Sequence, residues 1–238
     1  MMILIIALAT LATFVSWMLI SKASLRYLLG ILSMAILGLS VYFLTDHFLN
    51  HTGMKVETTT TTQQIYSAGD PSQAYGMIIY KNLGTKTDNK VIIYRNQKDD
   101  KKATSHFVPD KKDAIEAVKK SADFELADVK QAQVKTTTKR YVWKSQTAKR
   151  LYGFGGENKE LVSQKSVVQL PKKTWLALTP DQAKKLSSVA GQMKEQMESQ
   201  MAANPQQARQ IQELAQSDPQ AYAQMQVKMI KEILKIKS

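Results

Sequence analysis

Two long runs without a charged side chain open the sequence, and they constrain the fold more than any other feature. Each run has 19 residues, and the runs cover residues 2–20 and 27–45. A helix needs about 20 apolar residues to cross a hydrocarbon core of about 30 Å. The six residues between the runs allow only a tight turn. The sequence therefore predicts a hairpin of two transmembrane helices.

A cleaved signal peptide followed by one anchor is the alternative interpretation of these runs. A signal peptide begins with a basic segment, and no basic residue precedes the first run. Trp17 and Tyr27 flank the turn, where the membrane interface favours aromatic side chains. Small residues on one face of the first run also favour close packing of two helices. These residues are Ala9, Ala12, Thr13 and Ser16.

The basic residues that flank the runs predict the orientation of the hairpin. The turn contains Lys22 and Arg26, whereas the twelve residues after the second run contain only Lys55. Short loops rich in Lys and Arg remain in the cytoplasm during membrane insertion. We therefore expect the turn in the cytoplasm and residues 46–238 on the extracytoplasmic side of a cell membrane.

The remainder of the chain is basic and contains no cysteine. Residues 46–238 hold 31 basic and 20 acidic side chains, a net charge of +11. This charge favours anionic lipid headgroups or wall polymers, and it is also typical of an ordinary lysine-rich surface. Only four arginines occur there, which argues against specific nucleic-acid binding. The missing cysteines exclude disulfides, thiolate metal sites and cysteine nucleophiles.

Short segments rich in β-branched and aromatic residues follow the predicted hairpin. They cover residues 56–66, 75–83 and 90–97, with glycine, proline and aspartate between them. Such segments predict antiparallel strands. After Pro109 the apolar residues recur at helical spacing, which predicts a helix through about Ser121.

A second round of similar segments indicates a duplication. Residues 133–143 resemble residues 56–66, a second Tyr-Gly pair occurs at 152–153, and a second Pro-Asp pair at 180–181. The offsets are 77, 77 and 71 residues. A repeated β-β-β-α unit explains them, but threonine-rich segments also align with each other by composition alone. The sequence therefore predicts one or two such units.

The last part of the chain, residues 179–238, is rich in Gln, Met, Ala and Lys and has no strand pattern. Three helix starts repeat one device, a capping residue followed by proline at the first helical position. The three starts are Thr179-Pro180, Asn204-Pro205 and Asp218-Pro219. We expect a tail of amphipathic helices.

Apolar stripes occur on the first and last of these helices, and a basic face occurs on the last. The stripes are Leu186, Ala190, Met193, Met197 and Met201, then Tyr222, Met225, Met229, Ile230, Ile233 and Leu234, and the basic face is Lys228, Lys231, Lys235 and Lys237. Such helices pack on their own neighbours, lie on an anionic membrane, or accept a partner helix through the methionines. The sequence leaves these three alternatives open.

The predicted fold class is α+β, in three parts. Residues 1–46 form two transmembrane helices, at about 2–20 and 27–45. Residues 47–178 form a basic domain rich in antiparallel strands. Residues 179–238 form the Gln/Met-rich helical tail.

No constellation of catalytic residues is recognisable in the sequence. The patterns Ser-x-x-Lys, Gly-x-Ser-x-Gly, His-Glu-x-x-His and Gly-Lys-Ser/Thr are missing. The glycines at 153, 155 and 156 predict a turn, because no Lys-Ser/Thr follows them. Leu170–Thr174 resembles a sortase signal only superficially, since its terminal glycine and a hydrophobic tail are missing. We therefore predict no catalytic residue, no cofactor-binding residue and no cofactor.

The three histidines are the remaining candidates for a site. His47 and His51 are four residues apart beside Asp46, so both lie on one helix face and would hold a metal with one more ligand. Polar residues are also ordinary where a helix leaves the membrane, and we predict no metal site. His106 stands alone in an expected strand, and the acidic pair at 99–100 indicates a solvated turn.

Four segments carry a resemblance to a known family. They are NHTGMKVETTTTTQQIYSAG, VKTTTKRYVWKS, LYGFGGENKELV and LTPDQAKKL. With the two apolar runs, they make residues 1 to about 190 similar to a domain-of-unknown-function family of two-span membrane proteins. That family comes from lactic-acid bacteria and related Gram-positive bacteria. The resemblance implies a membrane location and a Gram-positive source, and it supplies no activity and no functional residues.

Together these features predict a membrane-anchored, non-enzymatic protein of the cell envelope that binds or interacts with another component. An accessory subunit of a membrane complex, docking through the hairpin and the methionine-rich tail, is the alternative, and an envelope hydrolase is less favoured. The expected partners are the lipid bilayer, an anionic lipid or wall polymer, and another membrane protein, but no specific nucleic acid.

Overall fold

The chain forms two compact units in a computed structural model that describes residues 1–84, 89–110 and 112–236. Within the helices α5 (Pro180–Ala203) and α6 (Pro205–Ser217), some side chains lie outside this description, namely those of residues 192–194, 196–198, 200–202, 205 and 207–208. Unit 1 comprises residues 1–59 and 138–163, and unit 2 comprises residues 60–137 and 164–238.

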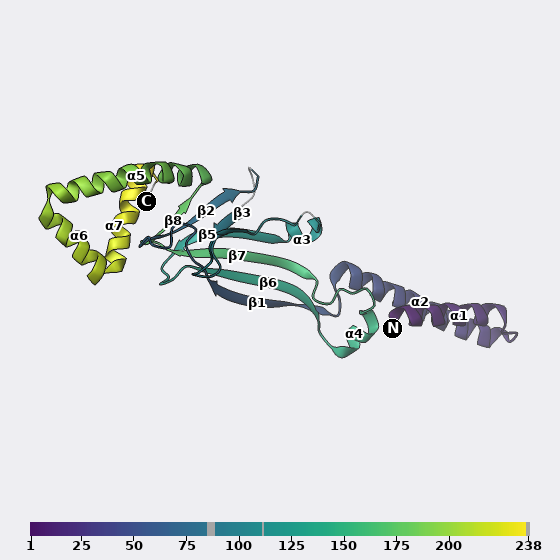
Figure 1. Cartoon of the computed structure of the whole chain (residues 1–238). Coiled ribbons are helices and arrows are strands. Elements are labelled where there is room, and N and C mark those ends of the chain that lie inside the picture. Colours follow the sequence, from purple (N-terminus) through teal and green to yellow (C-terminus); the bar gives the residue numbers. More distant parts are fainter. Residues whose placement is uncertain (85–88, 111, 237–238) are drawn as a thin grey trace. The chain divides into compact units, whose positions relative to one another are not determined.

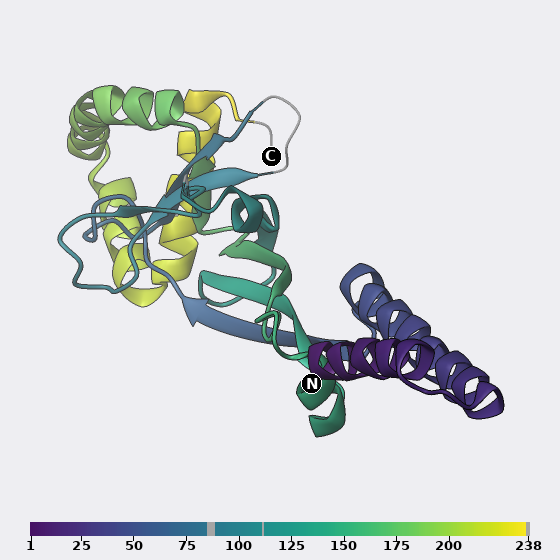
Figure 2. The same ribbon diagram turned by 90° about the vertical axis from the view of Figure 1, so that its right-hand side faces the viewer.

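Two antiparallel helices form the N-terminal part of unit 1 (Figures 1 and 2). Helix α1 covers Met2–Met18 and helix α2 covers Ala23–Asn50, so the turn is shorter than the sequence predicts. Helix α2 is long and apolar enough to cross a membrane, and α1 is a shorter apolar helix of 17 residues. The second helix also continues five residues beyond the predicted end at Thr45.

The contact between α1 and α2 is a seam of small residues at seven-residue spacing. The buried residues of α1 are Met2, Ala9 and Ser16, and those of α2 are Gly30, Ser33, Ser40 and His47. A repeat of seven keeps one line of residues facing a neighbouring helix, as in a coiled coil. Small side chains on this line let the two backbones approach closely.

The hydroxyl groups on the seam all have partners. Ser16, Ser33 and Ser40 donate to carbonyls of their own helices at 2.7–3.0 Å. Thr13 donates across the hairpin to Ser33 Oγ at 3.1 Å. At the turn, a Cβ on Gly30 would lie 2.7 Å from the indole Nε1 of Trp17, so only glycine admits this ring.

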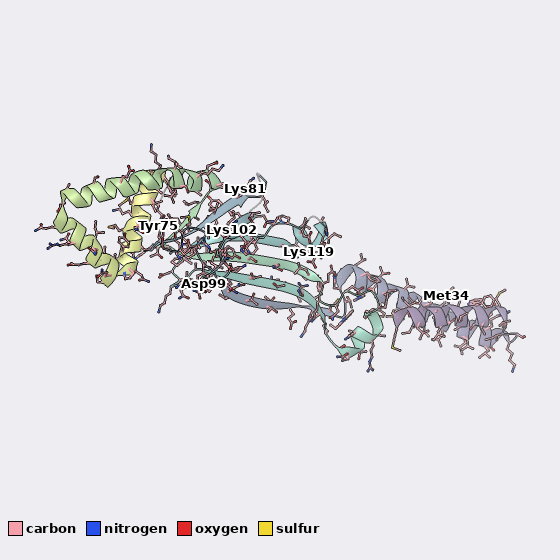
Figure 3. All side chains as sticks on the ribbon, viewed as in Figure 1. Met34, Tyr75, Lys81, Asp99, Lys102 and Lys119 are labelled. Carbon is pink, nitrogen blue, oxygen red and sulfur yellow. The ribbon has the colours of Figure 1, made fainter. Side chains whose placement is uncertain are left out.

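Large apolar side chains point away from the seam. Leu28 is 66% exposed and Met34 is 57% exposed, and Figure 3 shows Met34 on the outer surface of α2. Small and hydroxylated residues therefore lie inside the hairpin, and leucine, isoleucine and methionine lie outside.

Eight strands in the described part of the chain form two four-stranded sheets. One sheet has the order β1-β6-β7-β5 and the other β4-β3-β2-β8. The strands are β1 Met54–Gln64, β2 Gly76–Asn82, β3 Lys90–Tyr94, β4 Thr104–His106, β5 Lys120–Ala127, β6 Gln133–Trp143, β7 Leu161–Pro171 and β8 Trp175–Leu178. Strands β1, β6 and β7 contribute residues to both units. The α+β class is confirmed. The sheets are rich in antiparallel pairs, but β2 with β8 and β5 with β7 run parallel.

The first predicted helix is much shorter in the structure. Helix α3 covers only Ala114–Val118, and β5 starts two residues later. The apolar residues of this stretch have no surface to pack on, since Val118 is 83% exposed, whereas Ala122 is buried in the sheet. The prediction of a helix through Ser121 is therefore wrong, because sheet pairing outweighs the helical spacing.

The two expected rounds of the duplication fall on different elements. The first Tyr-Gly pair leads into β2, whereas the second ends helix α4, Gln146–Tyr152. The first Pro-Asp pair precedes the five-residue α3, and the second begins the 24-residue α5. The repeated motifs therefore join unlike elements of the structure.

The three tail helices begin at the predicted prolines. They are α5 Pro180–Ala203, α6 Pro205–Ser217 and α7 Pro219–Leu234, and they meet end to end as a triangle (Figures 1 and 2). Thr179 and Gln182 exchange backbone-to-side-chain hydrogen bonds at the start of α5. Asp218 caps α7 by accepting from the Ala221 N–H at 2.9 Å. Because such caps are local interactions, the first residues of these helices can be predicted from the sequence.

One hydrophobic core of unit 2 includes the tail. It joins Tyr75, Met77, Leu176 and Leu178 to Leu186 of α5 and to Ala223, Val227, Ile230 and Leu234 of α7. Of the expected α7 stripe, Ile230 and Leu234 are buried in this core, whereas Met229 is exposed. The side chains of Met193, Met197 and Met201 lie outside the described residues. The expected boundary between residues 178 and 179 falls inside unit 2.

A second core lies between the strands of unit 2. It contains Ile65, Ile78, Ile92, Tyr94, Ala132, Val134, Val168 and Leu170. Ile92 and Tyr94 alternate along β3, and Val168 and Leu170 alternate along β7, as expected for one face of a sheet.

We predict that α7 contributes to the stability of unit 2. Replacing the buried Ile230 by Ala should lower the free energy of unfolding by about 2–5 kcal/mol, because the change leaves a cavity in the core. Met229→Ala, one residue earlier on the exposed side, should change it by less than about 1 kcal/mol. Urea unfolding of the full chain in detergent, followed by circular dichroism, measures both. Equal small effects would show that the tail is separate from the core.

Candidate functional site

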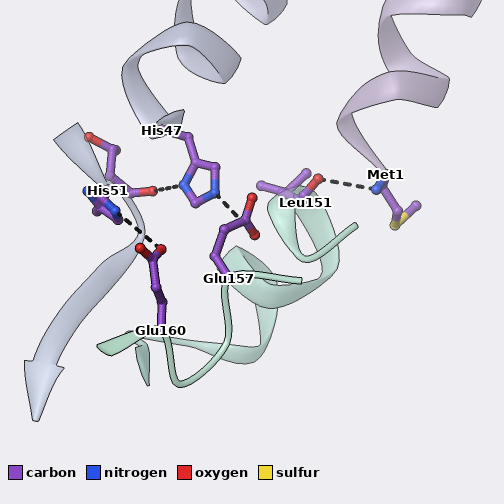
Figure 4. A network of polar contacts seen from close by, with 7 residues as sticks. Met1, His47, His51, Leu151, Glu157 and Glu160 are labelled. Carbon is purple, nitrogen blue, oxygen red and sulfur yellow. Dashed lines mark hydrogen bonds and ion pairs between the residues drawn. The ribbon is translucent and has the colours of Figure 1, made fainter. Parts of the chain in front are cut away.

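Aromatic, histidine and glutamate side chains enclose the C-terminal end of α2 in unit 1. We call this group the collar, and Figure 4 shows its histidines and glutamates. It consists of His47, His51, Tyr141, Trp143, Tyr152, Glu157 and Glu160. The collar combines the last seam residue of the hairpin with residues that follow it by about 100 positions in the sequence.

His47 is the centre of the collar and is 1% exposed. Its ring is stacked between Tyr152, with centroids 4.5 Å apart, and Trp143, with centroids 5.5 Å apart. Its Nδ1 lies 2.7 Å from the carbonyl oxygen of Thr52. Because a carbonyl only accepts, Nδ1 carries a proton, and Nε2 is the nitrogen that faces Glu157.

The contact between His47 and Glu157 is close but is not a hydrogen bond. Nε2 lies 4.0 Å from a carboxylate oxygen of Glu157, whose side chain is 15% exposed. Nε2 and both carboxylate oxygens are buried without a hydrogen-bond partner among the described residues. The contact is attractive only when a proton resides on Nε2 or on the carboxyl group, because otherwise two lone pairs face each other.

His51 forms a second, more exposed pair. Its ring stacks on Tyr141 at 3.9 Å between centroids, and its Nε2 lies 3.9 Å from Glu160. One turn of α2 separates the two histidines by about 6 Å, and the i, i+2 spacing of Tyr141 and Trp143 on β6 is about 6.6 Å. The helix and the strand therefore present their rings at matching intervals.

Local backbone geometry brings these elements together. His51 ends α2 with a left-handed φ of 54°, and Gly53 follows with φ of 93°. A Cβ on Gly53 would lie 3.2 Å from Cβ of Ala148, so glycine is required where this turn meets α4. Ser145 caps α4 by accepting from the Ala148 N–H at 3.1 Å. The Met1 nitrogen also donates to the carbonyls of Arg150 and Leu151 at the end of α4 (Figure 4).

The histidines and Asp46 do not form a metal site in the structure. The carboxylate of Asp46 accepts hydrogen bonds from Asn50 and Thr52. His47 and His51 face different glutamates. No group of three His, Asp or Glu side chains suited to a metal occurs in the part of the chain that the structure describes.

The other sequence candidates have local structural roles. Gly153 ends α4, and Gly156 has a left-handed φ of 80°, so the glycine cluster forms a turn. Asp100 accepts from the backbone N–H groups of residues 96 and 97, which closes the loop after β3. Neither feature brings together groups for catalysis.

His106 lies on β4 and stacks on Tyr94, with ring centroids 3.8 Å apart. Its Nε2 lies 3.0 Å from the Thr104 hydroxyl. Burial lowers the pKa of His106, and a hydrogen bond with the Tyr94 backbone partly opposes this effect. Burial also raises the pKa of Tyr94 to about 12, so this hydroxyl stays neutral at physiological pH.

Trp143, Tyr152, Glu157 and Glu160 are collar residues that the sequence does not identify. The two aromatic residues read as an ordinary strand and turn, and the glutamates lie in a charged stretch after the glycines. The spacing of Ser33, Ser40 and His47 is the one signal that could have found the centre, because it continues a buried line to a histidine.

Comparison with known families identifies the family of this chain. Residues 22–186 match a family described as a domain of unknown function, DUF4811. The chain belongs to the DUF4811 family. The matched DUF4811 region includes α2, all eight strands and every residue of the collar. No curated protein and no solved structure matches the chain in the corresponding comparisons.

The collar of this DUF4811 protein should depend on His47 more than on His51. We expect His47→Ala to lower the free energy of unfolding by about 2–4 kcal/mol, because it removes a buried ring stacked on two others. His51→Ala should cost less than about 1 kcal/mol, because that side chain is partly exposed. Chemical unfolding in detergent tests both variants, and equal costs would contradict the central role of His47.

The lowered pKa of His106 predicts that the stability of the folded chain depends on pH. Its folded pKa is lowered, so between that value and the unfolded value of about 6.5 the unfolded chain binds more protons. Stability from this group should be complete above about pH 6.5 and should fall as the pH drops below it. His106→Asn should reduce the slope of unfolding free energy between about pH 7 and 5. An unchanged slope in His106→Asn would contradict the assignment.

Proposed function

We propose that this DUF4811 protein is a two-span membrane protein whose extracytoplasmic α+β part is a non-enzymatic binding module of a Gram-positive cell envelope. The observation that carries the proposal is the inverted polarity of the hairpin. Its seam is small and hydroxylated, and its outer surface is large and apolar.

A soluble core helix has the opposite arrangement. It buries its large apolar residues, whereas α2 exposes Leu28, Ile31 and Met34. Exposing such surface to water costs about 25 cal/mol per Å². In a hydrocarbon core the same surface is solvated by lipid, and the seam hydroxyls are already bonded within the protein. A bilayer is therefore the medium that suits the hairpin.

The helix lengths support two spans. At 1.5 Å per residue, α1 extends about 26 Å and α2 about 42 Å, against a hydrocarbon core of about 30 Å. The excess length of α2 carries His47 and the start of the collar beyond the apolar part of the hairpin. Trp17 and Tyr27 pack edge to face at the turn, as interfacial aromatic residues do.

The proposed orientation places the turn in the cytoplasm. Lys22 and Arg26 flank the spans on that side, and only Lys55 lies close in sequence on the other. Unit 1 also contains Lys149 and Arg150. The positive-inside rule, however, applies to the basic residues that flank the spans during membrane insertion. These two residues follow the second span by about 100 positions and do not enter the count.

A binding role fits the chemistry of the described side chains better than catalysis. His47 and His51 face glutamates, and neither contacts a hydroxyl group in the described part of the chain. Docking of an accessory subunit through the tail is less favoured, because α7 buries its apolar face within unit 2.

Single-cysteine labelling tests the proposal, because the natural chain contains no cysteine. Lys144→Cys should react with a membrane-impermeant maleimide on intact cells, whereas Lys22→Cys should react only after lysis. The protein should also remain in the membrane pellet after alkaline carbonate extraction. Labelling of both positions on intact cells would contradict the hairpin, and the reverse pattern would invert the orientation.

A further inference from the structure

A cavity of about 270 Å³ in unit 2 is lined by cations and aromatic rings. Among the described residues that line it there is no carboxylate. Its charged residues are Arg95, Lys98 and Lys130, and its aromatic residues are Tyr66, Tyr75 and Trp175. Figure 3 labels Tyr75. We call this space the Arg95 cavity.

Arg95 gives the cavity a positive charge that no ion pair neutralises. The side chain is 9% exposed. Nε donates to the carbonyl of Asp100 at 3.0 Å, and Nη1 donates to the carbonyls of Gly69 and Ser67. None of the ion pairs within the described chain includes Arg95 or the two lysines. Carbonyls satisfy N–H groups without cancelling the charge, so an anion in the cavity is stabilised.

The neighbouring carboxylates are engaged by their own loops. Asp70 accepts from the N–H and hydroxyl of Ser72 at 2.9 and 2.8 Å. These hydrogen bonds lower the pKa of Asp70, and the charge of Arg95 makes a smaller contribution. Asp100 accepts from the N–H groups of residues 96 and 97. Neither acid lines the cavity, and both accept hydrogen bonds within their own loops, so the cations of the cavity are left available.

Trp175 provides a fixed apolar surface in the same cavity. Strands β2 and β8 run parallel with Gly76 opposite Trp175. A Cβ on Gly76 would lie 2.2 Å from Cε2 of the indole, so the ring rests directly on the glycine backbone. Because Trp175 is only half-buried, its indole offers a flat surface for the C–H groups of a sugar or polyol.

The cationic lining continues into a second cavity of about 600 Å³. Lys130 lines both cavities. The second also contains Lys172 and Lys173, with Asp128 as its one acidic residue among those described. Repeated cations along one path match repeated anionic groups, which favours a polymer over a single small anion.

We propose that the Arg95 cavity binds a phosphate-bearing sugar or polyol. Arg95, Lys98 and Lys130 hold the phosphate, and the carbon chain lies on Trp175. This inference rests on the proposed function, because it names the class of ligand that the proposed binding module takes. The same chemistry occurs in a polymer of polyol phosphates and in a lipid headgroup, and the two sources are separated by experiment.

The test uses the full chain in phosphatidylcholine nanodiscs, titrated with a synthetic glycerol-phosphate oligomer by calorimetry. The double variant Lys98→Gln/Lys130→Gln should weaken binding at least tenfold. The matched variant Lys81→Gln/Lys165→Gln loses the same charge at exposed positions of unit 2. Lys81 lies about 17 Å along β2 from Gly76, so this variant should weaken binding less than twofold. Equal weakening would show diffuse attraction and overturn the site.

Trp175→Phe tests the apolar contact. This variant should weaken the binding of the oligomer several-fold and leave the affinity for inorganic phosphate unchanged. An unaltered thermal melt shows that the variant is folded. Unchanged oligomer affinity would overturn the assignment of a sugar or polyol. Tighter binding of a single-stranded oligonucleotide with the same number of phosphates would overturn it as well.

Nanodiscs of phosphatidylglycerol separate the two sources. If the headgroup occupies the cavity, it should compete with the oligomer and lower its apparent affinity, and Lys98→Gln/Lys130→Gln should abolish this competition. Undiminished affinity supports a polymer that is not part of the bilayer. A failed membrane anchor shows itself differently, by release of the protein into carbonate with oligomer binding intact.

Discussion

The close approach of α1 and α2 is the interaction on which the rest of unit 1 depends. The two backbones approach because alanine, glycine and serine occupy the seam, and the serine hydroxyls bond within their own helices. This arrangement removes polar groups from the outer surface and leaves leucine, isoleucine and methionine there. It also fixes the rotation of α2, so the seventh residue after Ser40 points inward as well. That residue is His47, and the collar is built around it.

The collar in unit 1 and the Arg95 cavity in unit 2 differ in how their charged groups are paired. In the collar, each histidine faces a glutamate and stacks on aromatic rings contributed by β6 and α4. In the cavity, buried positive charge is balanced by carbonyls alone, and the nearby acids bond their own loops. A paired site of the first kind is suited to stabilising the fold. An unpaired site of the second kind is suited to an external anion.

Local signals made part of this structure predictable. The two N-terminal helices followed from the charge-free runs, and the strands predicted at residues 56–66, 75–83 and 90–97 overlap β1, β2 and β3. The tail helices begin at the predicted prolines, because capping is a local interaction. Helix α3 was overestimated, since its spacing suits a helix but sheet pairing decides the conformation from Lys120 onward. The buried face of α7 was predicted only in part. It includes Ile230 and Leu234 as expected, but also Ala223 and Val227, because an amphipathic pattern does not show which residues a distant sheet covers. The collar and the cavity join segments far apart in sequence, and no local pattern links His47 to Glu157 or Gly76 to Trp175.

Accessibility of spin labels along α2 tests the inverted polarity of the hairpin most directly. Single cysteines at Ser33 and Met34, in protein reconstituted into bilayers, carry nitroxides whose collisions with oxygen and with a polar nickel chelate are measured. A label at Met34 should collide often with oxygen, which dissolves in lipid, and rarely with the chelate. A label at Ser33 should collide rarely with both, because the seam excludes them. Frequent collisions of the Met34 label with the polar chelate would contradict a membrane-spanning hairpin.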